Sequence, residues 1–318
     1  MELSQEELGR IAEDLGLNQT FLKGKDKPVR NCWHFSSDGS AIDFMFYDEN
    51  DFRDGMNRIY VVVREYSVII LAFSLMDTHV HFVLYGDFDE CNRFVHDYLK
   101  RTSRHISLAH GDKKKLLAVP VSHQKVDTDS YLKTVISYTI KNAPVGGIPF
   151  SGCDYPWSSG PLYFRRSGYW SSPRWMTEAT VQTMGRRERQ RVLKAHQDSS
   201  DLVRMIDGLV FPGEYVAFEV VEMLFRTQRA FHFFLCRSRE EDVDARGGAI
   251  SHLSIPIQEM RQHRTELCRE LFQAKGVGSL DSAQRLRLAR ILKSRYNSSL
   301  KQIARLSGLV YDEVKDIL

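Results

Sequence analysis

Two histidines one residue apart are the first feature of this chain that could do chemistry. His79 and His81 flank Val80 within an apolar stretch that reads as a β-strand. Side chains at positions i and i+2 of a strand project from the same face, about 7 Å apart along it, so two imidazoles can share a divalent metal ion. The alternative is a pair of polar residues on the solvent-facing side of an antiparallel strand. The spacing alone leaves both interpretations open.

A tyrosine and an asparagine four residues apart form the second candidate. Tyr138 and Asn142 fall near the end of an expected helix, where i and i+4 side chains share a face. A phenol in that position could act as a nucleophile, and a carboxamide oxygen as a neutral metal ligand. The alternative is a buried core tyrosine beside a helix C-terminal asparagine. Tyr131 shares the face but lies two turns away, roughly 10.5 Å, so only one tyrosine can reach a given phosphate.

The C-terminal segment has the pattern of a helix-turn-helix. Ala304 is followed by Gly308 and then by Val314 and Ile317, which places a small residue at a helix contact, a glycine in the turn and apolar anchors on a second helix. Residues 283–318 carry eight basic and three acidic residues, a net charge of +5. The pattern predicts a DNA-binding tail, with a helical hairpin bearing a solvated basic face as the alternative.

Other basic residues could also meet phosphates. The outward face of the helix expected after Asp89 and the loop that follows it are both basic. The candidates for nucleic-acid contacts are Lys100, Arg101, Arg104, Lys113, Lys114, Lys115, Arg287, Arg290, Arg295, Lys301 and Arg305.

These residues need a scaffold of strands and helices to position them. Hydrophobic periodicity and capping residues predict helices over 4–16, 50–64, 89–107 and 129–142, and strands near 32–35, 41–46, 66–76, 79–85 and 116–121. That order predicts an α+β fold, with an antiparallel or mixed sheet and helices packed on one face. We expect an N-terminal helix and linker (1–29), an α+β domain (30–165), a helical middle region (166–275) and the tail (276–318).

Composition narrows the class of protein without naming a partner. The 318 residues are 42% hydrophobic and 27% charged, which excludes a disordered or fibrous chain. No apolar stretch approaches the ~20 residues of a membrane span, and the acidic N-terminus does not resemble a secretory signal. Five cysteines without a CxxC pair make a disulfide framework or a cysteine zinc site improbable, so we expect a cytoplasmic protein that does not bind membranes.

Taken together, residues 30–165 resemble the single-tyrosine HUH transposases, the family of insertion-sequence and REP-associated tyrosine transposases. LMDTHVHFVL (75–84) is similar to the family's HUH strand, YTIKNAPV (138–145), with Tyr131 and Leu132 before it, to its nucleophile helix, and DYPWSS (154–159) to the segment that follows. KQIAR (301–305) resembles the DNA-binding tail of larger members. Thr78 stands where the family often has asparagine, and an alanine separates Asn142 from the proline that usually follows it.

This resemblance implies a ferredoxin-like palm in which His79, His81 and Asn142 bind Mg²⁺ or Mn²⁺. Tyr138 would attack single-stranded DNA to form a 5′-phosphotyrosine link during the transposition of hairpin-bearing ends, in a monomer or a homodimer. Two other interpretations remain open: a DNA-binding regulator that descends from such a transposase and is catalytically inactive, and a metal-dependent phosphodiesterase that acts on small molecules.

Overall fold

The computed structural model shows an α+β chain that divides into two compact units. It describes residues 3–19, 22–38, 45–111, 119–141, 152–165, 178–194, 203–237, 257–296 and 300–311. The first unit comprises residues 1–143 and 151–238, and the second comprises 144–150 and 239–318. Among the described helices, none is both long enough and apolar enough to cross a membrane.

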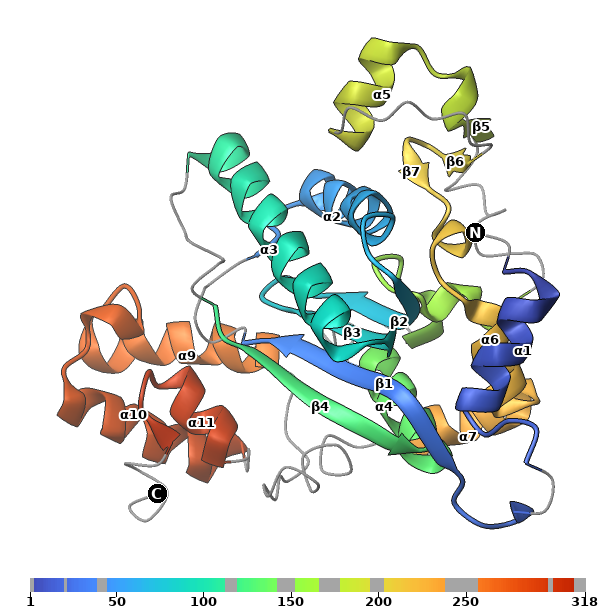
Figure 1. Cartoon of the computed structure of the whole chain (residues 1–318). Coiled ribbons are helices and arrows are strands. Elements are labelled where there is room, and N and C mark those ends of the chain that lie inside the picture. The colour runs from blue at the N-terminus through green and yellow to red at the C-terminus, as the bar shows by residue number, and fades with distance from the viewer. Residues whose placement is uncertain are drawn as a thin grey trace. The chain divides into compact units, whose positions relative to one another are not determined.

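A four-stranded antiparallel sheet is the centre of the first unit (Figure 1). Its elements follow the order β-α-β-β-α-β, and the strands lie in the order β2-β3-β1-β4. The elements are β1 (Pro28–Ser37), α2 (Glu49–Val63), β2 (Val68–Leu75), β3 (Val80–Gly86), α3 (Phe88–His110) and β4 (Val121–Thr128). The helix α4 (Asp129–Lys141) follows β4 directly.

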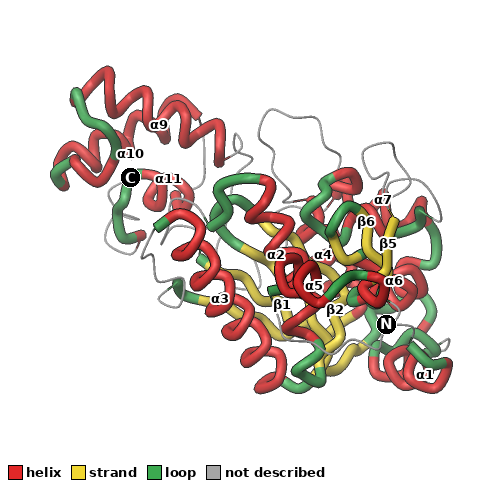
Figure 2. Tube along the Cα trace, turned by 90° about the horizontal axis from the view of Figure 1, so that it is seen from above, coloured by secondary structure: helices red, strands yellow, loops and turns green. Residues whose placement is uncertain are grey.

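Helices cover both faces of this sheet, so the expectation that all helices pack on one face is wrong. Neighbouring residues of β3 point to opposite faces. Phe82 contacts the rings of Phe94 and Tyr98 on α3, whereas the His81 ring contacts Tyr138 on α4. The helices α2 and α3 lie side by side on the first face (Figures 1 and 2). The helix α4 covers the histidine-bearing face, so the alternative in which His79 and His81 lie on a solvent-facing side of the sheet does not hold for His81.

The outer edge of β2 is sealed by a later part of the chain. The backbones of Trp157 and Ser159 hydrogen-bond to Leu75 and Phe73, and the Tyr163 hydroxyl donates to the Leu71 carbonyl. Two glycines let this segment approach the end of α4. A Cβ on Gly160 would lie 2.4 Å from the Gly152 carbonyl oxygen and 2.8 Å from a methyl carbon of Ile140. The sequence DYPWSS is therefore part of the structural support of α4.

The middle region is divided between the two units, because its residues up to 238 belong to the first unit and α9 (Ile257–Phe272) belongs to the second. The part in the first unit is not purely helical. It contains α5 (Arg186–Leu193), α6 (Phe218–Phe225) and α7 (Gln228–Arg237), as expected. It also forms a three-stranded antiparallel sheet of β5 (Glu178–Thr180), β6 (Arg204–Ile206) and β7 (Leu209–Val210). Strands of two or three residues are too short to give a period-2 signal in the sequence. N-terminal α1 (Gln5–Asp14) begins at the expected Ser4–Glu7 capping box.

The second unit is a small helical bundle. Its described helices are α9 (Ile257–Phe272), α10 (Ser282–Tyr296) and α11 (Leu300–Leu306). Their apolar residues form a common core that includes Leu267, Leu288, Leu292 and Ile303. Gly308 follows α11 with φ +66°, and the Arg285 guanidinium donates hydrogen bonds to the carbonyls of Gly308 and Leu280. The second helix of the expected helix-turn-helix falls in residues 312–318, outside the described residues.

Candidate functional site

Three histidines and one tyrosine converge on the face of the sheet that α4 covers. His81 lies on β3, His79 comes directly before that strand, His34 lies on β1, and Tyr138 projects from α4. The ring centroids of His79 and His81 are 4.8 Å apart, and that of Tyr138 is 5.7 Å from His81 and 6.2 Å from His34. The structure therefore brings together three of the four residues that the sequence predicts for catalysis and metal binding. The fourth, Asn142, lies outside the described residues.

His34 is the residue of this cluster that the sequence analysis missed. Its ring stacks on that of His81, with centroids 5.4 Å apart and planes 7° apart, and its Nε2 lies 3.2 Å from His81 Nδ1. Complete burial lowers the pKa of His34 to about 4, so the ring is neutral at neutral pH. One of the two facing nitrogen atoms carries a hydrogen and donates it to the other. The contact arises from the pairing of β1 with β3, which no local sequence motif reveals.

Each motif histidine has a neighbour on one ring nitrogen, Nδ1. Nδ1 of His81 is engaged by His34, and Nδ1 of His79 lies 2.9 Å from the Thr78 hydroxyl. Partners on one ring nitrogen fix the tautomer and orientation of metal-ligating histidines, which then ligate through the other nitrogen. Both rings would thus bind a divalent ion through Nε2. A site for Mn²⁺ or Mg²⁺ would also need oxygen ligands, which these ions prefer to imidazole nitrogen.

A row of small polar residues crosses the sheet at His81. Ser36 on β1 and Ser74 on β2 are the register partners of His81, and Ser122 on β4 pairs with Ser36. The Ser36 and Ser122 hydroxyl oxygens are 2.8 Å apart. Small side chains in this row leave room for the imidazoles between the sheet and α4.

Burial limits how a substrate could reach the cluster. The exposed fraction is 9% for Tyr138 and 4% for His81, whereas His79 is half-buried. Tyr131 is also buried on α4, two turns before Tyr138. A phosphodiester would therefore enter beside His79, at the end of α4 that carries Tyr138.

The three basic residues of α3 that were expected to contact nucleic acid do not lie at this cluster. Lys100, Arg101 and Arg104 lie on α3, which packs on the opposite face of the sheet. Arg101 forms ion pairs with Glu65 and Asp97, whereas Lys100 and Arg104 are exposed. The loop residues Lys113, Lys114 and Lys115 lie outside the described residues.

In the second unit, Arg290 of α10 is exposed. Arg287 is also exposed but lies over the Phe272 ring, 5.8 Å from its centroid. Arg305 is half-buried. The side chains of Arg295 and Lys301 are outside the described part of the chain.

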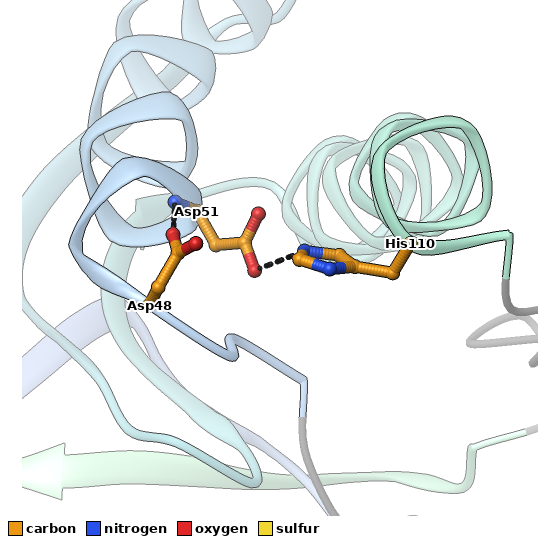
Figure 3. A group of neighbouring side chains, drawn as sticks. All are labelled: Asp48, Asp51 and His110. Carbon is orange, nitrogen blue, oxygen red and sulfur yellow. Dashed lines mark hydrogen bonds and ion pairs between the residues drawn. The ribbon is translucent and has the colours of Figure 1, made fainter.

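A second group of possible metal ligands joins α2 and α3. Asp48, Asp51 and His110 place their ligand atoms within 4.8 Å of one another (Figure 3). However, Asp48 Oδ1 caps α2 by accepting from the amides of Asn50 and Asp51. Asp51 accepts from the Tyr47 amide, from His105 and from His110. These hydrogen bonds give the carboxylates a structural role, and a cation would have to displace several of them.

His105 extends this group into a network of charges. Its Nε2 donates to Asp51, and its Nδ1 accepts from Lys194 Nζ at 2.6 Å. Burial, together with the positive charges of Lys194 and Arg58, lowers the pKa of His105 to about 4. Burial also lowers the pKa of Lys194 to about 8, with Arg58 acting in the same direction. The network fastens α5 to α2 and α3, as expected of a structural ionic cluster.

Comparison with known proteins adds no relative to this picture. No protein-family model, no curated protein and no solved structure matches the chain.

Proposed function

We propose that this protein is a divalent-metal-dependent transesterase that cleaves and rejoins single-stranded DNA through Tyr138, as a transposase of the single-tyrosine HUH type would. The observation that carries the proposal is the meeting of His79, His81 and Tyr138 on one face of the sheet. They come from two segments about 60 residues apart in sequence. The ring centroids of His79 and Tyr138 lie 4.8 Å and 5.7 Å from that of His81.

The architecture supports the same assignment. The β-α-β-β-α-β order and the strand order β2-β3-β1-β4 agree with a ferredoxin-like palm. In such a palm, β1 and β3 are the two central strands. Here β1 carries His34, β3 carries His81, and His79 comes directly before β3.

Each residue has a distinct role in the proposed reaction. The Tyr138 hydroxyl oxygen attacks the phosphorus, the bond to the 3′-oxygen breaks, and the phenolic proton passes to solvent while the released 3′-oxygen takes up a proton. A phenol has a pKa of ~10 and needs help to lose its proton. The cation held by His79 and His81 would polarise the phosphodiester and offset the charge on the departing oxygen. Because Tyr138 keeps a phosphoester, a 3′-hydroxyl can later attack it and rejoin DNA.

The second unit would supply contacts to a paired stem. Its basic α10 and the αL turn at Gly308 support a helix-turn-helix whose second helix begins near Tyr311. Hairpin-bearing ends contain both a duplex and a flanking single strand, and this substrate would engage both units.

The direct test is a denaturing gel of the purified protein with single-stranded hairpin oligonucleotides and Mn²⁺. We expect a covalent protein–DNA band that disappears with EDTA or in Tyr138→Phe. The matched control is Tyr131→Phe, because it removes the hydroxyl of another buried tyrosine on the same helix. If Tyr138→Phe retains the band, the assigned nucleophile is wrong.

The alternative functions predict different outcomes of this test. A catalytically inactive DNA-binding regulator would bind the oligonucleotide without any covalent band, and the low exposure of Tyr138 favours this alternative over the other. A small-molecule phosphodiesterase would hydrolyse a simple diester without DNA, in a reaction that needs neither Tyr138 nor the second unit.

A further inference from the structure

A cationic cavity lies in the first unit at the opposite end of α4 from Tyr138. It has a volume of about 750 Å³ and is formed by the chain before β1, the first turns of α4 and the end of α6. Volumes of this size are typical of sites for small organic ligands. Five basic residues line it: Lys23, Lys25, Lys27, Lys133 and Arg226.

The two acidic residues of the cavity are already engaged in structural contacts. Asp26 Oδ1 accepts from the Ser130 amide. Asp129 accepts from the Lys27 amide through Oδ1, and its Oδ2 lies 3.3 Å from Lys133 Nζ. Asp129 therefore compensates Lys133 and no other lysine of the cavity.

The remaining four basic side chains have no carboxylate within ion-pair distance among the residues that the structure describes. Three of these residues, Lys23, Lys25 and Arg226, are exposed. Lys27 is different, because its exposed fraction is only 7%. An anion in the cavity would supply a counter-charge to these side chains.

The first turn of α4 does not itself form the anion site. Its amides at Ser130 and Tyr131 donate to Asp26 and to the Thr128 hydroxyl. Binding would rest on side-chain cations, which suit flexible phosphate chains whose charges are spaced along a backbone.

We propose that this cavity binds phosphate groups of a single-stranded nucleic acid whose reacting phosphate lies at Tyr138. This inference rests on the proposed function. Ser130 at the cavity and Tyr138 at the cluster are eight residues apart on one helix, roughly 12 Å along its axis. A few nucleotides of extended strand span that distance. The cavity therefore holds the strand while α4 fixes its distance from the nucleophile.

The test measures binding of a fluorescent single-stranded oligonucleotide to the full chain, in EDTA so that no cleavage occurs, over a range of salt concentrations. The variant is Lys23→Ala/Lys25→Ala, in which both substituted side chains are exposed and outside the packed core. The control is Arg187→Ala/Arg191→Ala on α5, which removes the same charge from two exposed side chains that do not line the cavity. Melting temperatures establish that both variants fold.

We expect the cavity variant to bind about tenfold more weakly and its slope of log K against log salt to fall by roughly 1.4, since each lost phosphate contact on a single strand removes about 0.7. The α5 variant should match the wild type. Equal affinity and slope in the cavity variant and the wild type would overturn the inference.

Two further arms separate the possible sources of phosphate and the two proposals. Tripolyphosphate is the free probe: if it binds the wild type as tightly as the oligonucleotide does and displaces it, the cavity serves small phosphate compounds and the strand assignment is wrong. Tyr138→Phe should retain full binding. If the wild type forms the covalent product but the cavity variant binds the oligonucleotide normally, only the proposed role of the cavity is contradicted. If binding depends on the cavity but no covalent product forms, only the proposed reaction is contradicted.

Discussion

His34 and His81 lie on the two central strands with nearly parallel rings, and the Nε2 atom of His34 is 3.2 Å from the Nδ1 atom of His81. The contact fixes the rotation of the His81 ring and leaves its Nε2 as the atom to ligate a cation. His34 is thus a positioning residue, which acts on the proposed site through another histidine.

Removing His34 should weaken metal binding without removing a metal ligand. We expect His34→Ala to lower the affinity for Mn²⁺ by about 10–100-fold, the usual effect of losing a partner of a metal-ligating histidine. His34→Gln retains a group that can hydrogen-bond to His81 and should recover part of the affinity. Isothermal titration calorimetry measures both.

The control for this prediction is His123→Ala. His123 lies on β4 next to β1, but its ring contacts Phe35 and Phe88 on the opposite face. The substitution His123→Ala should therefore leave the affinity for Mn²⁺ unchanged. Equal losses in His34→Ala and His123→Ala would indicate a general disturbance of the sheet and contradict the positioning role.

Among the residues that the structure describes, the His79–His81 pair and the Asp48–Asp51–His110 group could each bind a cation, and substitution distinguishes them. We expect His81→Ala to abolish saturable Mn²⁺ binding and His110→Ala to leave it intact, because the hydrogen bonds of Asp48 and Asp51 already occupy the second group. Calorimetry of the two variants gives the answer. Binding that survives in His81→Ala and is lost in His110→Ala would place the ion between α2 and α3.

The low pKa of His105 predicts that acid destabilises the fold. The folded chain holds this group near pKa 4, whereas an unfolded histidine has a pKa of ~6.5. Between these values the unfolded state binds a proton that the folded state does not, so the free energy of unfolding falls as the pH decreases through that window.

His105→Gln should make this pH dependence shallower. His34 shifts in the same direction, so part of the dependence should remain. Chemical denaturation at pH 7 and pH 4.5 measures the change. A variant with the same pH dependence as the wild type would show that His105 is not held neutral by its surroundings.

Two arginines of the second unit should separate DNA binding from stability. Arg290 is exposed on α10, and Arg290→Ala should weaken duplex binding and lower the salt slope by roughly one unit with little effect on folding. Arg285 holds the carbonyls of Leu280 and Gly308, so Arg285→Ala should lower the free energy of unfolding by about 2 kcal/mol. Fluorescence anisotropy and denaturation provide the two readouts. The reverse pattern would contradict these roles.

The sequence predicted the elements whose packing requires a regular pattern of hydrophobic or capping residues. The Ser4–Glu7 box marks the start of α1, and the apolar runs around His79 and His81 become the paired strands β2 and β3. The sequence analysis missed β4, which runs over Val121–Thr128, whereas most of the strand expected near 116–121 lies outside the described residues. As an edge strand with exposed Ser122, His123, Lys125 and Asp127, β4 lacks the hydrophobic content on which the prediction relied.

The candidate site was predictable only where its residues are close in sequence. His79 and His81 are two residues apart, and Tyr138 lies on an amphipathic helix, so local spacing was sufficient. His34 depends on strand register, and Lys27 joins the cavity through contacts with α4 that are about 100 residues distant in sequence. Long-range pairing of this kind is fixed by the folded sheet and leaves no local signature.

The most direct measurement is to locate the covalent attachment itself. After reaction with a single-stranded oligonucleotide and Mn²⁺, nuclease treatment leaves a short nucleotide remnant on the protein, and trypsin cleaves after Lys133 and Lys141. This digestion separates Tyr131, in the peptide 126–133, from Tyr138, the sole tyrosine of the peptide 134–141. We predict that mass spectrometry finds the remnant on peptide 134–141. A remnant on peptide 126–133 or elsewhere, or none after DNA has been cleaved, would contradict the assignment of Tyr138 as the nucleophile.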